Sequence, residues 1–426
     1  MISKWRWIIV QLSRQLWVRA VLFALLAVAT ALMTLFFGDL IPSNLSGKIG
    51  AHAVDKILNI LASGMLVVTT FSLSVMVSAY STATSSISPR ATRLLMEDST
   101  TQNVLATFVG SFLYSLIGIT ALNAGIYGEE GRVILFIVTL VVIIIIVVTV
   151  LLLIEHLSHL GRVGETNDRV EKATLKAVLQ RAKYPWLGGS PLTDSALIPA
   201  NARPVYSKKI GYIQYIDIAA ISNWADDAEA RVYIHSLPGA FVHPKRILAW
   251  IEVDGEIEQH AIQSAFSIAD QRSFDQDPRF GFSVLTEIAS RALSPGINDP
   301  GTAIEIIGRG VRIFFSWREI DINQIRGEEL EDIEYPRVYI PPIKLCELFD
   351  DFFTPIARDG AHMVEVQIRL QKALASLAQI DEPFRLNAMR HSRIALSRAE
   401  AGLAFAGDLY ALRALVEELA LTPDPQ

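Results

Sequence analysis

The chain divides into an apolar first third and a mixed remainder. Four long apolar stretches lie in the first 154 residues, and none of them contains an Asp, Glu, Lys, Arg or His: residues 20–37, 57–79, 104–122 and 133–154. Because a helix rises about 1.5 Å per residue, each stretch is long enough to cross a bilayer core of roughly 30 Å. The pattern predicts a transmembrane domain in residues 1–154, with four helices at about 18–37, 57–79, 104–122 and 133–154.

The remainder has the charge density and turns of a water-soluble body. A polar helical pattern follows the fourth stretch and predicts a juxtamembrane helix and linker in residues 155–202. Short alternating runs separated by Gly and Pro predict a small β-rich module in residues 203–253. Helical periodicity then returns, so the expected fold class is an α-helical four-span membrane domain followed by an α+β cytoplasmic domain, in which helices cover the β module.

Two further regions complete the expected domain organisation. Residues 254–345 read as a helical motif region, with an acidic, proline-punctuated loop over 321–342. Residues 346–426 predict a C-terminal helical hairpin, whose two helices are separated at Asp381-Glu382-Pro383.

Basic residues are distributed unevenly around the four apolar stretches. They gather before the first, after the second and after the fourth: Lys4, Arg6, Arg14, Arg19, Arg90, Arg93, Arg162, Arg169, Lys172 and Lys176. Because cytoplasmic segments of membrane proteins carry the excess of Lys and Arg, the N-terminus and the C-terminal domain are expected in the cytoplasm. The length of the apolar run through Phe37 favours a first span over a cleaved signal peptide.

Charge and cysteine content restrict the partners and the chemistry. The net charge is +3 before Glu155 and −9 from Glu155 onward, so the soluble part lacks the basic face that nucleic acids require. Cys346 is the single cysteine, which excludes an internal disulfide and a cysteine metal cluster. No signature of a phosphate-binding loop, a dinucleotide fold, a zinc protease, a kinase or a hydrolase is present. We therefore expect no enzyme activity, cofactor or bound metal.

Hydroxyl side chains recur every four residues along the second span and its exit. Thr70, Ser74, Ser78 and Thr82 fall on one stripe of a helix at this spacing. Such a stripe has two interpretations: small hydroxylated residues let helices pack closely, or hydroxyls from several subunits line a pore. For the packing interpretation, the small-residue row of the third span is the natural partner: Ala106, Gly110, Tyr114 and Gly118.

Charged side chains are densest in and after the run 270–281. The ligand-binding candidates are the arginines and acids of this run with two residues that follow the next helix: Arg272, Asp275, Asp277, Arg279, Asn298 and Asp299. Carboxylates of this kind hold a small ligand or ion, or act as acid and base. Alternating Arg and Asp also form salt bridges that fix loops, and Asn298 or Asp299 before Pro300 is typical of a helix cap.

Two motifs resemble a known family. The first is Ser88-Pro89-Arg90, which also predicts a helix start, followed by Asp98 and the aromatic run 108–114. The second is longer and runs from Phe274-Asp275-Gln276-Asp277 to Ala292-Leu293-Ser294-Pro295-Gly296-Ile297-Asn298-Asp299-Pro300. Together they resemble an uncharacterised family of predicted bacterial integral membrane proteins. The resemblance implies four spans and a soluble C-terminal region in the bacterial inner membrane, and it implies no established activity.

These observations lead to one functional hypothesis and two alternatives. The hypothesis is an oligomeric inner-membrane protein in contact with the lipid bilayer, whose cytoplasmic domain senses a small ligand or ion and gates a hydroxyl-lined pore. The first alternative is a membrane scaffold that recruits cytoplasmic partners without transport. A membrane-bound hydrolase is a distant third.

Overall fold

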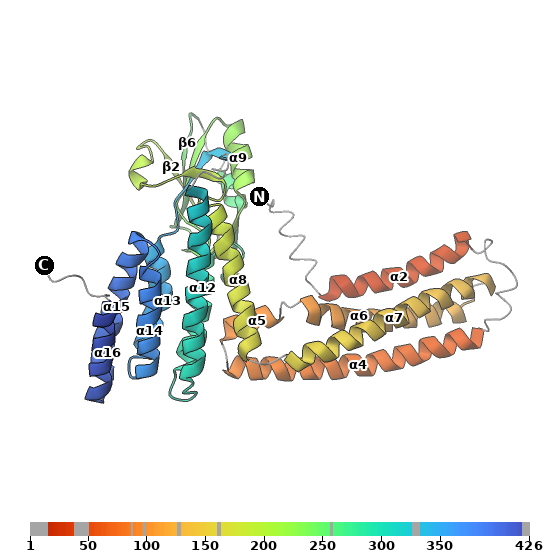
Figure 1. Cartoon of the computed structure of the whole chain (residues 1–426). Helices are drawn as coiled ribbons and strands as arrows, with labels where there is room; N and C mark the ends of the chain where they lie inside the picture. The colour runs from red at the N-terminus through yellow and green to blue at the C-terminus, as the bar shows by residue number, and fades with distance from the viewer. Residues whose placement is uncertain are drawn as a thin grey trace. The chain divides into compact units, whose positions relative to one another are not determined.

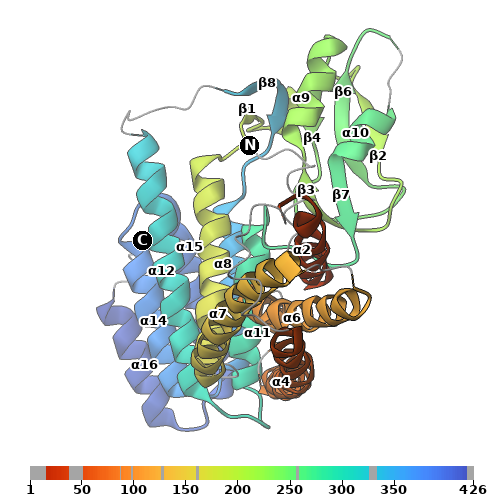
Figure 2. The same ribbon diagram turned by 90° about the vertical axis from the view of Figure 1, so that its right-hand side faces the viewer.

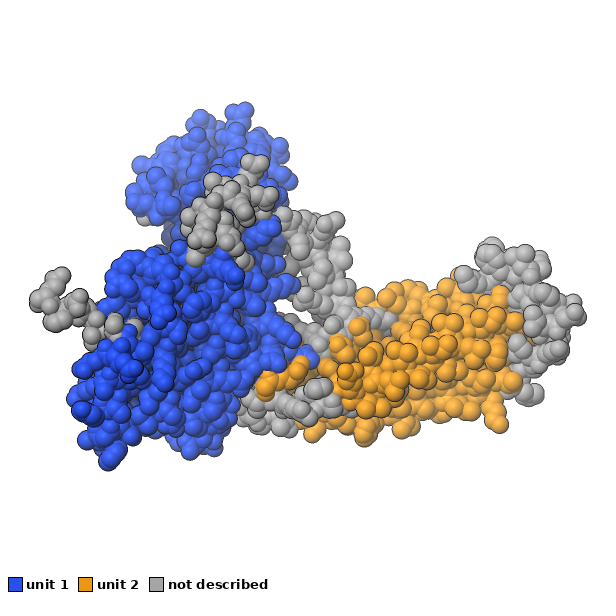
Figure 3. Space-filling view, in the orientation of Figure 1, with its two compact units in different colours: residues 1–4, 86–91, 166–426 blue, residues 5–85, 92–165 orange. Residues whose placement is uncertain are grey.

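The computed structural model describes residues 16–37, 51–86, 88–96, 99–125, 129–159, 163–255, 259–325 and 333–419. The chain forms two compact units (Figure 3). Unit 2 takes residues 5–85 and 92–165, and unit 1 takes residues 166–426 together with two short segments, residues 1–4 and 86–91.

Unit 2 consists of long apolar helices. They are α2 (Leu16–Phe37), α4 (Ala51–Ser86), α6 (Ser99–Asn123) and α7 (Glu129–His159), and α5 (Pro89–Met96) follows α4 across the boundary with unit 1 (Figure 1). Among the residues that the structure describes, three segments are long and apolar enough to cross a bilayer, namely Ala53–Ser81, Thr100–Asn123 and Gly131–His156. Within α2, the shorter segment Val21–Thr30 is apolar, and a span at 18–37 stays a prediction.

The core of unit 2 lies between α4, α6 and α7. Leu58, Phe108 and Leu135 are fully buried there, and the Tyr114 hydroxyl lies 3.1 Å from the Thr139 hydroxyl. This hydrogen bond satisfies two polar groups at a depth where water is absent from a bilayer.

The small-residue row of α6 has two partners rather than the one expected. A Cβ at Gly110 would overlap the side chain of Phe23, so this glycine lets α2 approach α6. Gly118, about two turns further along α6, lies beside Leu58 of α4 instead. The row expected to pack on the second span therefore has two partners, since Phe23 of the first helix lies at Gly110 and Leu58 of the second span lies at Gly118.

Unit 1 contains two β-sheets. The larger has strand order β1-β8-β4-β6-β2, with β8 parallel to β1 and β4 and the remaining pairs antiparallel. The smaller has order β5-β3-β7 and is antiparallel. The strands are β1 (Gly189–Pro191), β2 (Arg203–Tyr206), β3 (Gly211–Ile216), β4 (Arg231–Ile234), β5 (Phe241–Val242), β6 (Ile247–Glu252), β7 (Phe266–Ala269) and β8 (Tyr335–Ile340).

Three short helical segments accompany these sheets. They are η2 (Ser195–Leu197), α9 (Ile218–Asp227) and α10 (Gln259–Ala265). The α9 helix begins where the Asp217 carboxylate accepts a hydrogen bond from the Ala220 amide at 3.1 Å, and it packs against β8 and β4 (Figure 2). The sheets extend beyond the predicted module at residues 203–253, because the strands β1, β7 and β8 lie outside this range. Part of the loop expected at 321–342 is therefore the strand β8, which adds to the sheet between β1 and β4.

The rest of unit 1 is a bundle of helices that run alongside one another (Figures 1 and 2). The helices are α8 (Val163–Lys183), α11 (Pro278–Ala292), α12 (Pro300–Ile325), α13 (Leu345–Asp359), α14 (Val364–Ala378), α15 (Glu382–Gly402) and α16 (Ala406–Glu418). The segment expected as one C-terminal hairpin thus contains four helices. The predicted break at Asp381 is confirmed, since its carboxylate caps α15 by accepting from the Phe384 amide at 3.0 Å.

Phenylalanine rings fill the centre of this bundle. Phe314 of α12 stacks on Phe282 of α11, with ring centroids 4.7 Å apart, and it also contacts Phe349 of α13 at 4.8 Å. A Cβ at Gly310 would overlap the ring of Phe352, so α12 approaches α13 closely only because this position is a glycine. Burial of several aromatic side chains in one cluster is a large apolar contribution to the stability of unit 1.

Candidate functional site

Helix α4 has two chemically different faces. One face packs into the core of unit 2 through Leu58, Ser72 and Met76, all of which are buried. The opposite face is exposed and carries Thr70, Ser74 and Ser78 together with apolar side chains such as Val67 and Phe71. The side chain of Thr82, the fourth member of the predicted stripe, lies outside the described residues.

The hydroxyls on the exposed face are satisfied within their own helix. The Thr70 hydroxyl donates to the Leu66 carbonyl at 2.9 Å, and the Ser74 hydroxyl donates to the Thr70 carbonyl at 2.9 Å. About two turns before Thr70, the Ser63 hydroxyl donates to the Asn59 carbonyl at 2.9 Å. Because each hydroxyl uses its single hydrogen in this way, the oxygen lone pairs remain as acceptors on the outer face.

The charged candidates of the second motif form a network at the start of α11. Arg272 donates to both oxygens of Asp277, with its Nε 2.7 Å from Oδ2 and its Nη2 2.9 Å from Oδ1. Asp277 is 2 % exposed and also caps α11 by accepting from the Phe280 amide at 3.1 Å. Burial raises the pKa of the Asp277 carboxyl, while hydrogen bonds from Arg272 and Phe280 act in the opposite direction.

Arg279 belongs to a second ion pair beside the first. Its Nε lies 2.6 Å from Asp351 Oδ2, and its Nη2 lies 3.1 Å from Asp351 Oδ1. Its Nη1 donates to Glu347. Both carboxylates come from α13, so Arg279 joins the start of α11 to the bundle.

A third arginine is buried near the same carboxylate. The Arg181 side chain of α8 is 5 % exposed, and its Nε and Nη1 have no hydrogen-bond partner among the described residues. Burial lowers the pKa of Arg181 to about 10, and the nearby Asp277 carboxylate opposes this change. The start of α11 therefore lies among buried positive charge, for which Asp277 is a counter-ion.

The remaining ligand candidates serve local structure or lie elsewhere. Asp275 Oδ2 accepts from the Ser273 hydroxyl at 2.9 Å. Asp299 caps α12 by accepting from the Thr302 amide at 3.1 Å and from its hydroxyl at 2.6 Å, and Asn298 is exposed with φ +51°. These two follow the far end of α11, a 15-residue helix, and do not join the network at its start. Within the described ranges, no three His, Cys, Asp or Glu side chains are arranged to hold a metal.

Comparison with known proteins agrees with the membrane-protein features of unit 2. A family model described as a predicted membrane protein, DUF2254, matches residues 13–376. The chain belongs to the DUF2254 family. This membership confirms the resemblance drawn from the two motifs and identifies a predicted membrane protein.

The curated relatives are uncharacterised proteins. The uncharacterised proteins MT1328 of Mycobacterium tuberculosis and Mb1321c of Mycobacterium bovis are each 27% identical to this chain over 248 residues. The match covers 56% of this chain and 47% of each relative, so the chain spans about half the length of these curated relatives. No solved structure matches the chain.

In this DUF2254 chain, the residues directly after α4 pair with α11. The Ser88 hydroxyl donates to Glu287 Oε2 at 2.7 Å, and Arg90 forms an ion pair with the other oxygen of the same carboxylate. Ser88 also accepts from the Arg90 amide at 3.2 Å, which confirms the predicted start of a helix at Pro89. Residues 86–91 accordingly group with unit 1.

Sequence reasoning missed Glu287, Glu347 and Asp351 as partners of these arginines. Glu347 and Asp351 are four residues apart on a helix whose aromatic residues define its buried face, and this spacing marks them as neighbours. Nothing in the sequence connects them to Arg279, because a helix-to-helix contact over about 70 residues depends on the tertiary fold.

Proposed function

We propose that this protein forms a homo-oligomer in the membrane, in which the hydroxyl faces of neighbouring α4 helices line a narrow passage. In this proposal unit 1 lies in the cytoplasm, senses a ligand and regulates the passage. The observation that carries the proposal is the exposed hydroxyl face of α4, which is turned away from the core of its own unit.

The argument starts from the solvent around a membrane helix. Lipid tails offer no hydrogen bonds, so lipid-facing surfaces are typically apolar, as on α7, where Ile144 and Leu151 are each 63% exposed. The outer face of α4 presents the hydroxyls of Thr70 and Ser74 among exposed apolar side chains such as Phe71. Contact with the same face of another copy, or with water between copies, is a better environment for these oxygens than hydrocarbon.

The chemistry of this face defines what a passage would conduct. Residues 57–79 of α4 contain no titratable side chain, and the hydrogens of Thr70 and Ser74 are bonded internally. A wall of uncharged oxygen acceptors favours water and small cations over anions. A proton-coupled mechanism would require a titratable group at this depth, so we propose passive conduction.

The pairing after α4 supports a regulatory role for unit 1. Ser88 and Arg90 follow the end of α4 by only a few residues, and both bind Glu287 of α11. A change in the position of α11 would therefore reach the end of α4 along a short stretch of chain. The same helix begins at Asp277, within the buried charge network.

Ion flux from liposomes tests the proposal. Purified full-length protein is expected to release trapped K⁺, and Ser74→Trp should abolish the release because an indole ring fills the space between neighbouring α4 helices. The matched control is Ile144→Trp, which places the same indole ring on the exposed face of α7 and should conduct normally. Equal flux from Ser74→Trp and wild type would exclude a passage at α4.

A scaffold without transport is the alternative, and one observation favours it. Phe405 and Tyr410, at the start of α16, are 68% and 77% exposed, and exposed aromatic side chains are common at protein interfaces. A scaffold predicts no flux from any variant, together with loss of partner binding in Phe405→Ser and Tyr410→Ser.

A further inference from the structure

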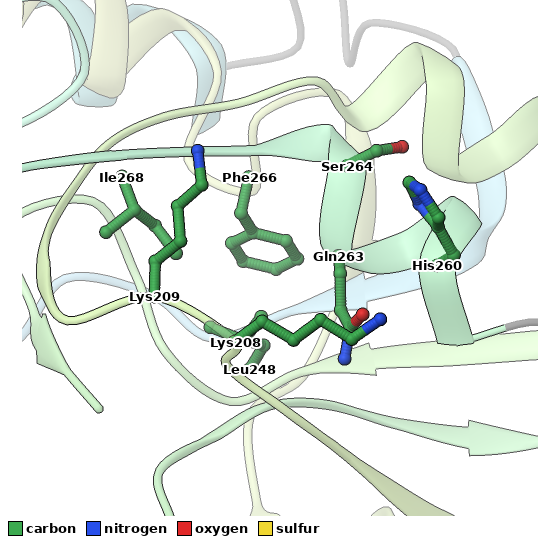
Figure 4. A pocket seen from close by; sticks show the side chains of 8 residues that line it. All are labelled: Lys208, Lys209, Leu248, His260, Gln263, Ser264, Phe266 and Ile268. Carbon is green, nitrogen blue, oxygen red and sulfur yellow. The ribbon is translucent and has the colours of Figure 1, made fainter. Parts of the chain in front are cut away.

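A cavity of about 280 Å³ lies in the β-rich part of unit 1 (Figure 4). Its lining comes from four separate elements: the turn between β2 and β3, strand β6, helix α10 and strand β7. The lining residues are Lys208, Lys209, Leu248, His260, Gln263, Ser264, Phe266 and Ile268. None of them belongs to the network at the start of α11 or to the exposed face of α4.

The cavity has an apolar floor and a cationic rim. Leu248 and Phe266 are buried, and the Phe266 ring lies at the centre of the opening in Figure 4. Lys208, Lys209 and His260 are exposed around it. Among the described residues, no carboxylate lines the cavity, and neither lysine forms an ion pair. The two lysines therefore give the rim positive charge, and none of the described lining residues is an acid.

Gln263 adds a fixed hydrogen-bond acceptor. Its Nε2 donates to the Tyr206 carbonyl at 2.9 Å, which holds the carboxamide in one orientation. Its Oε1 is buried and has no hydrogen-bond partner among the described residues. A buried carbonyl oxygen without a partner is costly, and an N–H or O–H group in the cavity would satisfy it.

We infer that this cavity binds a small phosphate ester. The phosphate pairs with Lys208 and Lys209, the organic part lies on Phe266 and Leu248, and a donor on that part binds Gln263 Oε1. The volume is at the lower end of the roughly 300–1,000 Å³ of ligand pockets, which restricts the ligand to about the size of a mononucleotide. The inference does not rest on the proposed passage, because its test measures ligand binding and not ion flux.

A phosphate ester reaches such a site from two sources, solution or the headgroup of a lipid. Adenosine 5′-monophosphate represents the first, and adenosine and inorganic phosphate are its two halves. Vesicles of phosphatidylcholine with phosphatidylglycerol represent the second, with pure phosphatidylcholine vesicles as their reference.

Equilibrium dialysis of the full-length protein in neutral detergent measures the binding of a soluble phosphate ester. We expect adenosine 5′-monophosphate to bind more tightly than either half, and Lys208→Ala/Lys209→Ala to weaken binding at least about tenfold, because two charge-assisted contacts are lost. Lys245→Ala is the matched control: this lysine is exposed in the same module and does not line the cavity. The altered lysines are all exposed, so the thermal unfolding of each variant should equal that of wild type.

The possible results distinguish a soluble ligand, a lipid headgroup and the absence of a phosphate site. Nucleotide binding lost in the double variant and kept in Lys245→Ala supports a soluble ligand. An effect of the double variant that appears only as weaker association with phosphatidylglycerol vesicles supports a lipid headgroup. Equal losses in the double variant and in Lys245→Ala, or no phosphate-dependent binding to either probe, would overturn the inference.

Discussion

The two sets of polar residues that the sequence singles out satisfy their hydrogen bonds in opposite ways. On α4, Thr70 and Ser74 donate to carbonyls four residues away and remain exposed. At the start of α11, Asp277 is buried and bound by Arg272, while Arg279 pairs with Asp351 at a distance of 72 residues along the chain.

The difference indicates which set holds the structure together and which is available for other contacts. Charges that are buried against distant partners fix the fold, because removing one leaves the other without a counter-ion. Hydroxyls bonded to their own helix contribute little to packing within unit 2, so their outer face is available to another copy. Of the residues proposed as ligands from the sequence, Arg272 and Asp277 form an ion pair with each other, and Arg279 pairs with two acids of α13.

The largest expected effect comes from removing the buried carboxylate. Asp277→Ala leaves Arg272 and Arg181 without a counter-ion and removes the cap of α11, so the free energy of unfolding should fall by about 3–5 kcal/mol. Urea unfolding followed by circular dichroism measures the change. The control is Glu382→Gln, which breaks the exposed pair with Arg385 and should behave as wild type. Similar stability of the two variants would contradict a structural role for the network.

Acid pH should weaken the bundle through a second buried group. Burial in contact with Phe349 and Phe353 lowers the pKa of His391 to about 4 from 6.5, with Arg390 and Arg398 acting in the same direction and Asp350 opposing them. The unfolded chain binds this proton first as the pH falls, so the contribution is complete above about pH 6.5 and is lost towards pH 4. The loss is at most about 1.4 kcal/mol per pH unit.

Comparison of wild type with His391→Gln isolates this effect. The variant should lose less stability than wild type between pH 6.5 and 4 when both are titrated with urea. If the two stability curves run parallel over this range, His391 does not titrate as its burial requires.

A smaller loss of stability is expected at Arg279, because its ion pairs are partly exposed to solvent. Arg279→Gln removes the ion pairs with Asp351 and Glu347, whose side chains are 22% and 38% exposed, and should cost about 1–2 kcal/mol. Arg279→Lys keeps the charge and loses the two-point geometry, so its unfolding midpoint in urea should lie between those of wild type and Arg279→Gln. A midpoint of Arg279→Gln equal to wild type would show that these pairs do not stabilise the bundle.

The smallest effect on stability is expected on α4. Ser74→Ala removes a hydroxyl that is bonded only to its own helix, so the free energy of unfolding should change by less than about 0.5 kcal/mol. Thermal unfolding in detergent measures it, with Ser72→Leu as the contrasting variant, because Ser72 is buried and added volume there is not tolerated. A large loss in Ser74→Ala would place its side chain in the core.

Local features of this fold were predictable from the sequence, and long-range pairings were not. The starts of α5, α12 and α15 follow from Ser88-Pro89, Asp299-Pro300 and Asp381, because a cap depends on neighbouring residues alone. The strand β8 was expected to be a loop, because Pro336 and the prolines after Ile340 interrupt its alternation of apolar and polar residues. Its partners β1 and β4 also lie far away along the chain, so no local signal indicates the pairing.

The candidate sites follow the same rule. The hydroxyl stripe of α4 is a local repeat, so its common face was visible in the spacing of Thr70, Ser74 and Ser78. Whether that face is buried or exposed depends on the packing of the helices in unit 2, which the spacing does not give. The cavity beside Phe266 collects residues from four elements, and no spacing in the sequence connects them.

Thiol modification during current recording tests the central claim most directly. In a Cys346→Ser background, Ser74→Cys places the only cysteine on the proposed wall, and Ile144→Cys places it on the outer face of α7. We predict discrete currents from both proteins in planar bilayers, and block by a charged methanethiosulfonate reagent in Ser74→Cys alone. Currents that persist unchanged after modification at position 74, or no current from any variant, would contradict a passage lined by α4.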